Sequence, residues 1–457
     1  MAKYNLEPVE VAHVKTKYRI IKTKLPVPES LPIFRDLEKS EPRSMMGQPP
    51  VIWDKAEGFC VWDKWGNRWI DWSSGVLIAN AGHGRKEIVD AIKQAIRKPL
   101  LSTYVFAHEK RRELTLALKQ LAPEPGNYRV FLLTTGSEAI ENSLKLARTY
   151  ALEKYGPKRK YVVSFQNAFH GRTMGSQLAG GIESLKKWLV DEGRNFVQVP
   201  FPDGFKNEDT SFELFERSLK EKKVKPGEIA CVITESYQGV GPDFLPFDYA
   251  KKLERFCREN DILTIFDEIQ AGFGRTGKMF CFEHYDVKPD LIVCGKGISS
   301  SLPISAVIGR KEIMDLYPPG SMTSTHSASP LPVIAAIENL KIIKEKNLTE
   351  NAGKMGEILI PELHRIRNKY PHVLGCVQGR GLVAGIQVVK KGTKEPDPDT
   401  ALMINERCFH KGVLMFAPVG VGGECIKIAP PLVITEEALK ESLGVLEEAC
   451  DEVLKGE

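Results

Sequence analysis

The sequence predicts an α/β fold, with a mostly parallel sheet in a large domain and a smaller α+β domain. Strand-like apolar runs alternate with helical patterns through the middle of the chain, which is typical of a parallel sheet covered by helices. The 457 residues are 42% hydrophobic and 27% charged, enough for two or three domains with a large core. After Pro330 a long helical stretch leads into a mixed region that ends at Glu457. We therefore expect an N-terminal arm with part of the small domain over 1–70, a large domain over 71–335 and a C-terminal small domain over 336–457.

The individual elements follow from apolar periodicity and turn residues. Val51 to Trp72 predicts short strands with turns at Glu57-Gly58 and Gly66-Asn67. One expected helix spans 138–155, with Ile140, Leu144, Ala147 and Ala151 on one face, and another spans 247–260. The expected strands of the large domain are continuous apolar runs at 130–133, 161–165, 230–234, 262–266, 291–295 and 304–309.

Composition excludes several classes of protein. Sixty-four basic and 59 acidic residues leave a charge of +5, too small for nucleic acid to be the main partner. No apolar stretch approaches the roughly 20 residues of a membrane span, and charges interrupt the N-terminal segment, so we expect neither a membrane segment nor a signal peptide. The nine cysteines form no C-x-x-C pair, so we expect no metal site and a reduced, cytoplasmic compartment.

Reactive residues stand where the expected strands end. Thr134-Thr135-Gly136-Ser137 follows the first run, Glu235 the third, Asp267-Glu268 the fourth and Lys296 the fifth. In an open α/β sheet, ligands bind beyond the carboxyl ends of the strands. We therefore expect a loop, acids and a lysine to meet at one edge of the sheet.

Lys296 and Asp267 each allow two interpretations. Partial burial would lower the pKa of the Lys296 amine and favour its nucleophilic form, which can condense with an aldehyde. The alternative is a lysine that reaches solvent from a strand end. A buried Asp267 must be paired, and a protonated pyridine nitrogen, as in pyridoxal phosphate, is one such partner. The alternative is a helix N-cap.

The segment Thr135 to Glu138 joins a strand to a helix. Thr135 and Glu138 fit a capping box. Free N–H groups at the helix start, with the Ser137 hydroxyl, would hold a phosphate. A cap without a ligand is the alternative.

Gly272 to Gly277 matches G-x-G-x-x-G after a strand, a pattern found in dinucleotide sites, with Asp290 as the candidate ribose acid. The residues that follow, KMFCFEHYDVKPD, lack the periodicity of a helix that would receive a pyrophosphate. A flexible turn is the better interpretation, so this motif alone gives little support for a nicotinamide oxidoreductase.

Several motifs together resemble the class III, or ω-amino acid, aminotransferases. FDEIQAGFGRTG followed by DLIVCGKGIS is similar to the signature of that family, and TTGSEAIENSLKLAR resembles its phosphate-binding loop and helix. FHGRT and STHSASPLP resemble two further family segments, and the order matches from about Val51 to the C-terminus. The resemblance implies fold type I of the pyridoxal-phosphate-dependent transferases, with pyridoxal 5'-phosphate as the cofactor.

The resemblance also implies roles around the cofactor ring. Lys296 would carry the cofactor on its amine and Asp267 would keep the pyridine nitrogen protonated. Gln270 would approach the ring hydroxyl. Phe169 would stack on the ring, with the adjacent His170 as the alternative.

The remaining cofactor contacts implied by the resemblance involve two chains. Gly136 and Ser137 would bind the phosphate, joined by Thr325 from a second copy of the chain. Glu235 matches the acid that begins the E-P-x-Q-G motif and would lie near the ring. A shared site implies a homodimer.

Two positions depart from the family pattern. Many members have a second glutamate where this chain has Val240, and an arginine where it has Lys427. Lys427 keeps the positive charge but loses the bidentate fork of a guanidinium. We expect Lys427 to anchor a substrate carboxylate. The alternatives are that Lys427 is a solvated strand residue and that the carboxylate site lies near Trp72, Val76 or Tyr104.

These observations predict a pyridoxal-phosphate-dependent aminotransferase similar to 4-aminobutyrate aminotransferase. It would move an amino group from an amino acid, ω-amino acid or amine to a 2-oxo acid by a ping-pong mechanism. The alternatives are a racemase or decarboxylase that uses the same cofactor, and a non-catalytic cofactor-binding protein. Racemisation benefits from a second acid/base group, which Val240 cannot supply.

Overall fold

The computed structural model describes residues 4–190 and 193–455, which fall into two compact units. Unit 1 comprises Met1–Arg85 and Glu350–Glu457, and unit 2 comprises Lys86–Thr349. The functional domain boundaries expected after residues 70 and 335 stay a prediction.

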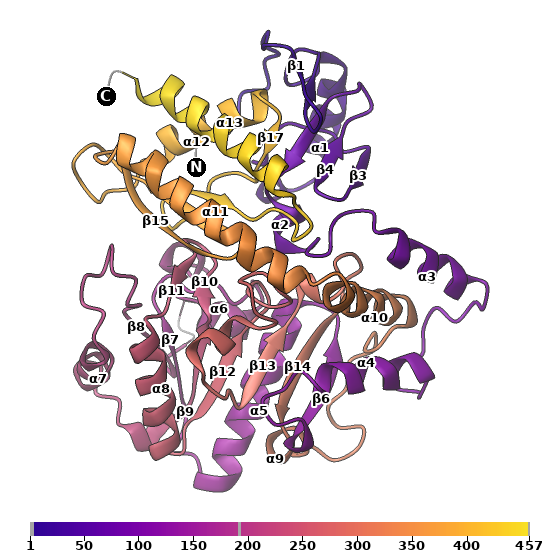
Figure 1. The fold of residues 1–457 in the computed structure, drawn as a ribbon. Coiled ribbons are helices and arrows are strands. Elements are labelled where there is room, and N and C mark those ends of the chain that lie inside the picture. Colours follow the sequence, from indigo (N-terminus) through magenta and orange to yellow (C-terminus); the bar gives the residue numbers. More distant parts are fainter. Residues whose placement is uncertain (1–3, 191–192, 456–457) are drawn as a thin grey trace. The chain divides into compact units, whose positions relative to one another are not determined.

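Unit 2 is built on a seven-stranded sheet with the order β6-β14-β13-β12-β9-β7-β8 (Figure 1). Strand β14 runs antiparallel to both of its neighbours, and the other pairs are parallel. The predicted mostly parallel sheet is thus confirmed. In chain order, its strands are β6 (Tyr128–Leu133), β7 (Tyr161–Phe165), β8 (Phe196–Val199), β9 (Ile229–Glu235), β12 (Leu263–Asp267), β13 (Leu291–Cys294) and β14 (Ser305–Arg310).

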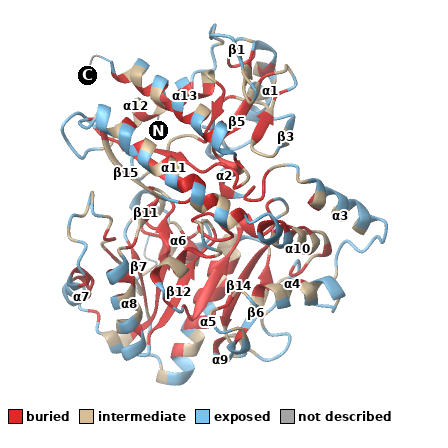
Figure 2. Ribbon diagram, in the orientation of Figure 1, coloured by how far each residue is buried: buried red, intermediate tan, exposed pale blue. Residues whose placement is uncertain are grey.

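Helices flank this sheet, and Figure 2 shows buried strands beside helices with exposed outer faces. A short hairpin, β10 (Tyr237–Gln238) and β11 (Asp243–Phe244), follows β9. The α-helices of unit 2 are α3 (Lys86–Ile96), α4 (Glu109–Lys119), α5 (Gly136–Tyr155), α6 (Met174–Ala179), α7 (Phe212–Glu221), α8 (Phe247–Glu259), α9 (Lys311–Met314) and α10 (Pro330–Glu345).

Helix α5 illustrates how local residues define an element. Its four predicted apolar positions are all buried, and most of them belong to a core cluster that includes Ile265 of β12 and Val293 of β13. Gly156 ends the helix with φ of 80°, a conformation that costs glycine little because it has no Cβ atom. The helix therefore starts and stops where local chemistry predicts and packs through its apolar stripe.

Unit 1 contains two sheets and a set of helices. One sheet has the order β1-β2-β5-β4-β3, with β17 paired to β5, and the other has the order β15-β16-β18. The strands are β1 (Val14–Lys15), β2 (Ile20–Ile21), β3 (Lys55–Glu57), β4 (Cys60–Trp62), β5 (Arg68–Asp71), β15 (Leu374–Arg380), β16 (Val383–Val388), β17 (Val413–Leu414) and β18 (Cys425–Ile428). The α-helices are α1 (Leu31–Ser40), α2 (Ser74–Leu77), α11 (Leu348–Lys369, which begins in unit 2), α12 (Pro398–His410) and α13 (Glu436–Leu454).

Two further properties concern the helices and the cysteines. None of the helices in the described part of the chain is long and apolar enough to cross a membrane. All nine cysteines are free thiols; Cys376 is half-buried and the others are buried.

Candidate active site

The carboxyl ends of β9, β12 and β13 bring the predicted acids and lysine to one edge of the sheet. Asp267 lies opposite Glu235 on one neighbouring strand and opposite Val293 on the other. Lys296 follows the end of β13 by two residues. Asp267 and Glu235 are 4% and 5% exposed, so both carboxyl groups lie largely away from water.

Asp267 is held by two hydrogen bonds. His170 Nδ1 lies 2.8 Å from Asp267 Oδ2, and the Ile269 N–H donates to Asp267 Oδ1 over 3.0 Å. No α-helix follows Asp267 directly, because the chain forms turns until a 3-10 helix begins at Cys281. The helix N-cap interpretation of Asp267 is therefore wrong. His170 is 2% exposed, and its Nε2 atom has no hydrogen-bond partner among the described residues.

Glu235 connects two loops beside Asp267. Its Oε2 atom accepts the Phe169 N–H over 2.9 Å, and its Oε1 atom accepts the Gly239 N–H over 2.8 Å. A Cβ atom at Gly239 would lie 2.9 Å from Gln270 Oε1, so a larger residue there would displace the end of the Gln270 side chain. Burial raises the pKa of Glu235 to about 7, and the nearby Asp267 carboxylate adds to the rise.

This raised pKa predicts how stability changes with pH. In the cofactor-free protein, folded Glu235 keeps its proton to about pH 7, whereas the unfolded chain releases it near the ordinary value of 4.5. The folded state therefore binds more protons between these values, so the stabilisation that Glu235 gives below pH 4.5 is lost as the pH rises through 7. Glu235→Gln should remove this loss, which is on the order of 3 kcal/mol.

Urea unfolding of wild type and Glu235→Gln at pH 5, 6, 7 and 8 measures the effect. As the pH rises, the unfolding free energy of the wild type should fall relative to that of Glu235→Gln. Glu216→Gln is the control, because Glu216 is exposed on α7. Parallel curves for wild type and Glu235→Gln would contradict the prediction.

Lys296 is half-buried and has an unusual backbone. Its φ is 42°, a left-handed value that non-glycine residues adopt at a cost and that is common at functional sites. Its amine makes no hydrogen bond or ion pair with any residue the structure describes. Burial lowers the pKa of Lys296, and the charges of Asp267 and Glu235 only partly oppose this. The amine is thus biased toward its neutral form, as predicted for a nucleophile.

Asn339, which the sequence did not single out, supports the turn at Lys296. Its buried amide donates to the carbonyl oxygens of Gly297 and Ile298 over 2.8 and 2.9 Å. The available signal was an asparagine within the apolar pattern of α10, where a polar side chain needs a partner.

The loop before α5 has the predicted cap with one difference. Thr135 Oγ1 accepts the Glu138 N–H over 3.2 Å, but the Glu138 carboxylate accepts the N–H of Thr134 rather than that of Thr135. Within the described chain, the N–H groups of Gly136 and Ser137 have no acceptor. Ser137 Oγ accepts a backbone N–H from Arg172 over 3.2 Å. Two donors at a helix N-terminus thus remain available to an anion.

Thr325 belongs to a segment that is tied to this loop. Ser324 Oγ donates to Glu138 over 2.6 Å, and Ser327 Oγ bonds the Leu132 carbonyl oxygen of β6. Thr325 itself is exposed, and it makes no side-chain hydrogen bond with the described residues of its own chain.

The substrate candidates are divided between the two units. In unit 1, Val76 has φ of 63° and is 45% exposed, and Trp72 is fully buried and accepts the Ala429 N–H through its carbonyl oxygen. In unit 2, Tyr104 is 41% exposed and its hydroxyl lies 3.0 Å from Thr323 Oγ1. A carboxylate site near these three residues stays a prediction.

The burial of Lys427 contradicts the alternative that it is a solvated strand residue. It lies on β18 opposite Gly385 of β16 and is only 1% exposed. The interpretation as a solvated strand residue is therefore wrong.

The glycine motif is a turn, as expected. Residues 272–277 form consecutive turns, and the only helical segment nearby in the described chain is the short 3-10 helix at Cys281–Tyr285. Asp290 accepts hydrogen bonds from the Thr264 N–H and hydroxyl and pairs with Arg310 at 2.6 Å. The candidate ribose acid is thus used within the fold. Among the described residues there is also no group of three or more His, Cys, Asp and Glu side chains that suits a metal ion.

Comparison with known proteins identifies the family. The model of the class III aminotransferases matches residues 43–450, most of the chain. The chain belongs to the class III aminotransferases. Its membership agrees with the confirmed α/β architecture, which is that of fold type I, and with the motif order in the sequence.

Three relatives illustrate the range of this aminotransferase family. The chain is 33% identical over 405 residues to a probable 4-aminobutyrate aminotransferase of Bacillus subtilis (86% of this chain, 91% of that protein). It is 32% identical over 423 residues to an alanine/serine racemase of Pyrococcus horikoshii (89% of this chain, 87% of that protein). It superposes with a TM-score of 0.82 and 26% identity on the ornithine aminotransferase of Toxoplasma gondii, covering 94% and 96% of the two chains, in a structure with partial occupancy of PLP at that protein's active site.

Proposed function

We propose that this class III aminotransferase uses pyridoxal 5'-phosphate to move an amino group from an amino acid, ω-amino acid or amine to a 2-oxo acid. The overall activity would be similar to that of a 4-aminobutyrate aminotransferase, with ping-pong kinetics. The observation that carries the proposal is the amine of Lys296, biased toward its neutral form, at the sheet edge that also holds the buried carboxylate of Asp267.

The side chains present fit this cofactor. A phosphate would meet the N–H groups of Gly136 and Ser137, which have no acceptor among the described residues. A protonated ring nitrogen would complement the Asp267 carboxylate, whose burial demands a cationic partner. His170 would support that carboxylate through its Nδ1 atom, and its Nε2 atom, which lacks a partner among the described residues, is consistent with a group outside the chain.

Each residue then has a defined task in the reaction. Bound at this edge, pyridoxal phosphate supplies an aldehyde that condenses with amines and a ring that withdraws electrons from the substrate Cα. Lys296 would take the proton from the substrate Cα and return it to the aldehyde-derived carbon of the cofactor, because a neutral amine is a base of suitable strength. Asp267 keeps a proton on the ring nitrogen. Glu235 holds the backbone of Phe169, whose ring would pack on the cofactor with Gln270 near its hydroxyl.

Racemisation is the second candidate, because one of the reported relatives is named a racemase. It uses the same proton abstraction but returns the proton to the opposite face of Cα, for which a second acid/base group is useful. Val240 cannot act in this way, so transamination ranks first. Decarboxylation has no specific support.

An assay of amino donors with and without a 2-oxo acid acceptor tests the proposal. 4-Aminobutyrate, ornithine and alanine would be incubated with 2-oxoglutarate or pyruvate, and the new amino acid would be measured. Transamination predicts product only when an acceptor is present. Formation of D-amino acid from L-amino acid without an acceptor would instead support a racemase. If neither product forms, both candidate functions are contradicted.

The proposed partner is a second copy of the chain. Thr325 is exposed, which suits a residue that reaches the phosphate of a partner site. We also propose a cytoplasmic location, for which the free thiols of all nine cysteines are the support.

Lys427 is proposed to anchor the substrate carboxylate, and Lys427→Met tests this with a side chain of similar length. Loss of a charge-assisted hydrogen bond should raise KM for amino acids roughly ten- to hundredfold and leave amines without a carboxylate unaffected. The measurement is KM for 4-aminobutyrate against that for a simple alkylamine. Equal increases for both would show that Lys427 is structural, and thermal melting would check that the variant is folded.

A further inference from the structure

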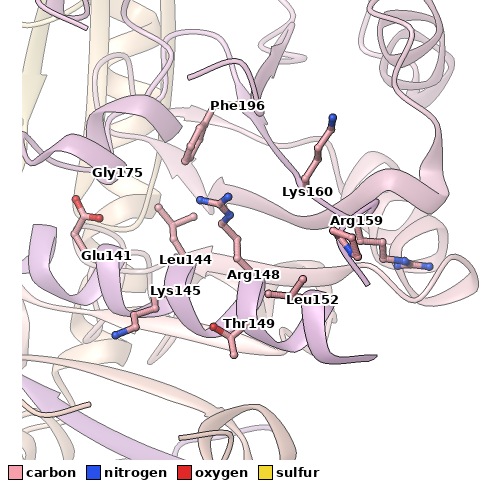
Figure 3. A pocket seen from close by; sticks show the side chains of 11 residues that line it. Glu141, Leu144, Lys145, Arg148, Thr149, Leu152, Arg159, Lys160, Gly175 and Phe196 are labelled. Carbon is pink, nitrogen blue, oxygen red and sulfur yellow. The ribbon is translucent and has the colours of Figure 1, made fainter. Parts of the chain in front are cut away.

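Unit 2 has a hollow of about 500 Å³ beside the outer face of α5, separate from the residues of the candidate active site (Figure 3). Its walls come from α5, the loop between α5 and β7, Gly175 of α6 and Phe196 of β8. The volume lies within the range of roughly 300–1,000 Å³ that is typical of small-molecule sites.

The walls of this hollow carry an excess of positive charge. Four cationic residues line the hollow, together with a single acid: Lys145, Arg148, Arg159 and Lys160, with Glu141. The Oε1 atom of Glu141 is already used at the start of α6, where it accepts the Thr173 hydroxyl over 2.6 Å and the Ser176 N–H over 3.1 Å. The residues that line the hollow therefore carry more positive than negative charge.

Arg148 differs from the other three cations. Arg159 donates to the backbone oxygens of Asn260 and Asp261, and the Lys145 and Lys160 ammonium groups lie over tyrosine rings at 4.8 and 5.3 Å. Arg148 is exposed and makes no hydrogen bond, ion pair or ring contact with any described residue. Figure 3 shows its guanidinium extending into the hollow near Leu144 and Phe196. The planar fork is thus free to bind an anion in a bidentate manner.

Apolar side chains surround this guanidinium. Leu144 and Phe196 flank it, and Leu152 on the same helix is 54% exposed, which is a large apolar surface to leave in water. A bare inorganic ion would contact the guanidinium and leave the exposed Leu152 and the half-buried Phe196 in water. A ligand with an apolar body would cover them.

We propose that the hollow binds an organic phosphate, with the phosphate on Arg148 and the apolar body against Leu152 and Phe196. A dianion matches the excess of cations better than a single carboxylate does. The proposal does not depend on the reaction at Lys296, because no residue is shared between the two sites.

Calorimetric titration with phenyl phosphate tests the proposal, with inorganic phosphate and benzoate as comparison ligands. The protein would first be loaded with pyridoxal phosphate and then desalted, so that the proposed cofactor site is filled and no free pyridoxal phosphate competes for the hollow. Phenyl phosphate should bind more tightly than either comparison ligand. Arg148→Gln should weaken its binding roughly ten- to hundredfold, and Leu152→Ser about three- to tenfold.

Lys158→Gln is the matched control, because it removes one charge from an exposed position in the same loop that does not line the hollow. It should leave the affinity within about twofold, since exposed charges at a distance are screened. Three results would each overturn the proposal: equal affinity in wild type and Arg148→Gln, equal binding of inorganic phosphate and phenyl phosphate, and tighter binding of benzoate. Both mutated side chains are exposed, so the variants should fold normally, and thermal melting verifies this.

Discussion

Lys296→Ala is expected to reduce amino-group transfer on the order of 10⁴-fold, the largest effect of any single substitution in this chain. The amine is the proposed attachment point of the cofactor and also the base that moves the substrate proton. Alanine removes both roles at once. The Lys296 side chain makes no hydrogen bond or ion pair with the described residues, and alanine can adopt the left-handed backbone at a cost similar to that for lysine. The substitution should therefore leave the fold intact.

Two measurements check this result. Borohydride reduction of the wild type followed by peptide mapping should place the cofactor on Lys296, within LIVCGKGIS. Added ethylamine should restore part of the turnover of Lys296→Ala, because a free amine can take over the proton transfer. Lys311→Ala, which replaces an exposed lysine of α9, should retain full activity. A reduced label on another lysine would contradict the assignment.

Asp267→Asn is expected to lower kcat by roughly 10²–10³ while the protein stays folded and keeps the cofactor. Asparagine is the same size and can still accept the Ile269 N–H that Asp267 Oδ1 accepts over 3.0 Å. It cannot balance a positive charge on the ring nitrogen. The substitution therefore separates the electrostatic role of Asp267 from its role in the turn.

Steady-state kinetics and the cofactor content of the purified variant measure this effect. Under the proposal, kcat falls and the cofactor content changes little, since the donors of Gly136 and Ser137 supply the phosphate site. If Asp267 only shapes the turn, the Asp267→Asn variant would support near-normal turnover. That outcome would remove Asp267 from the proposed mechanism.

The strand ends of unit 2 could be predicted because their cause is local. Runs such as those before Asp267 and Lys296 are apolar on both faces, so they read as buried strands wherever they occur. Topology then brings their carboxyl ends to one edge. The cap at Thr135 and the helix end at Tyr155 could also be predicted, because helix termini depend on a few neighbouring residues.

Other features depend on residues far apart in the chain. His170 and Asp267 are 97 positions apart, and Glu235 and Phe169 are 66 apart. The sequence suggested a ring-stacking or ring-facing role for the FHGRT segment, but no pattern in it indicates which atom receives which hydrogen bond. The support of the Lys296 turn by Asn339 was missed for the same reason.

By itself, the sequence determined the α/β class, six of the seven strands of the large sheet and the two reactive residues at neighbouring strand ends, because periodicity and capping are properties of short segments; β8 (Phe196–Val199) was missed. Only the tertiary structure decided that Glu235 joins two loops, that Lys427 is buried opposite Gly385 and that Arg148 extends beside apolar side chains. Each of these depends on which surfaces meet when the chain packs. Burial, and with it the pKa of a carboxyl or an amine, is set by that packing and not by the neighbouring residues in the chain.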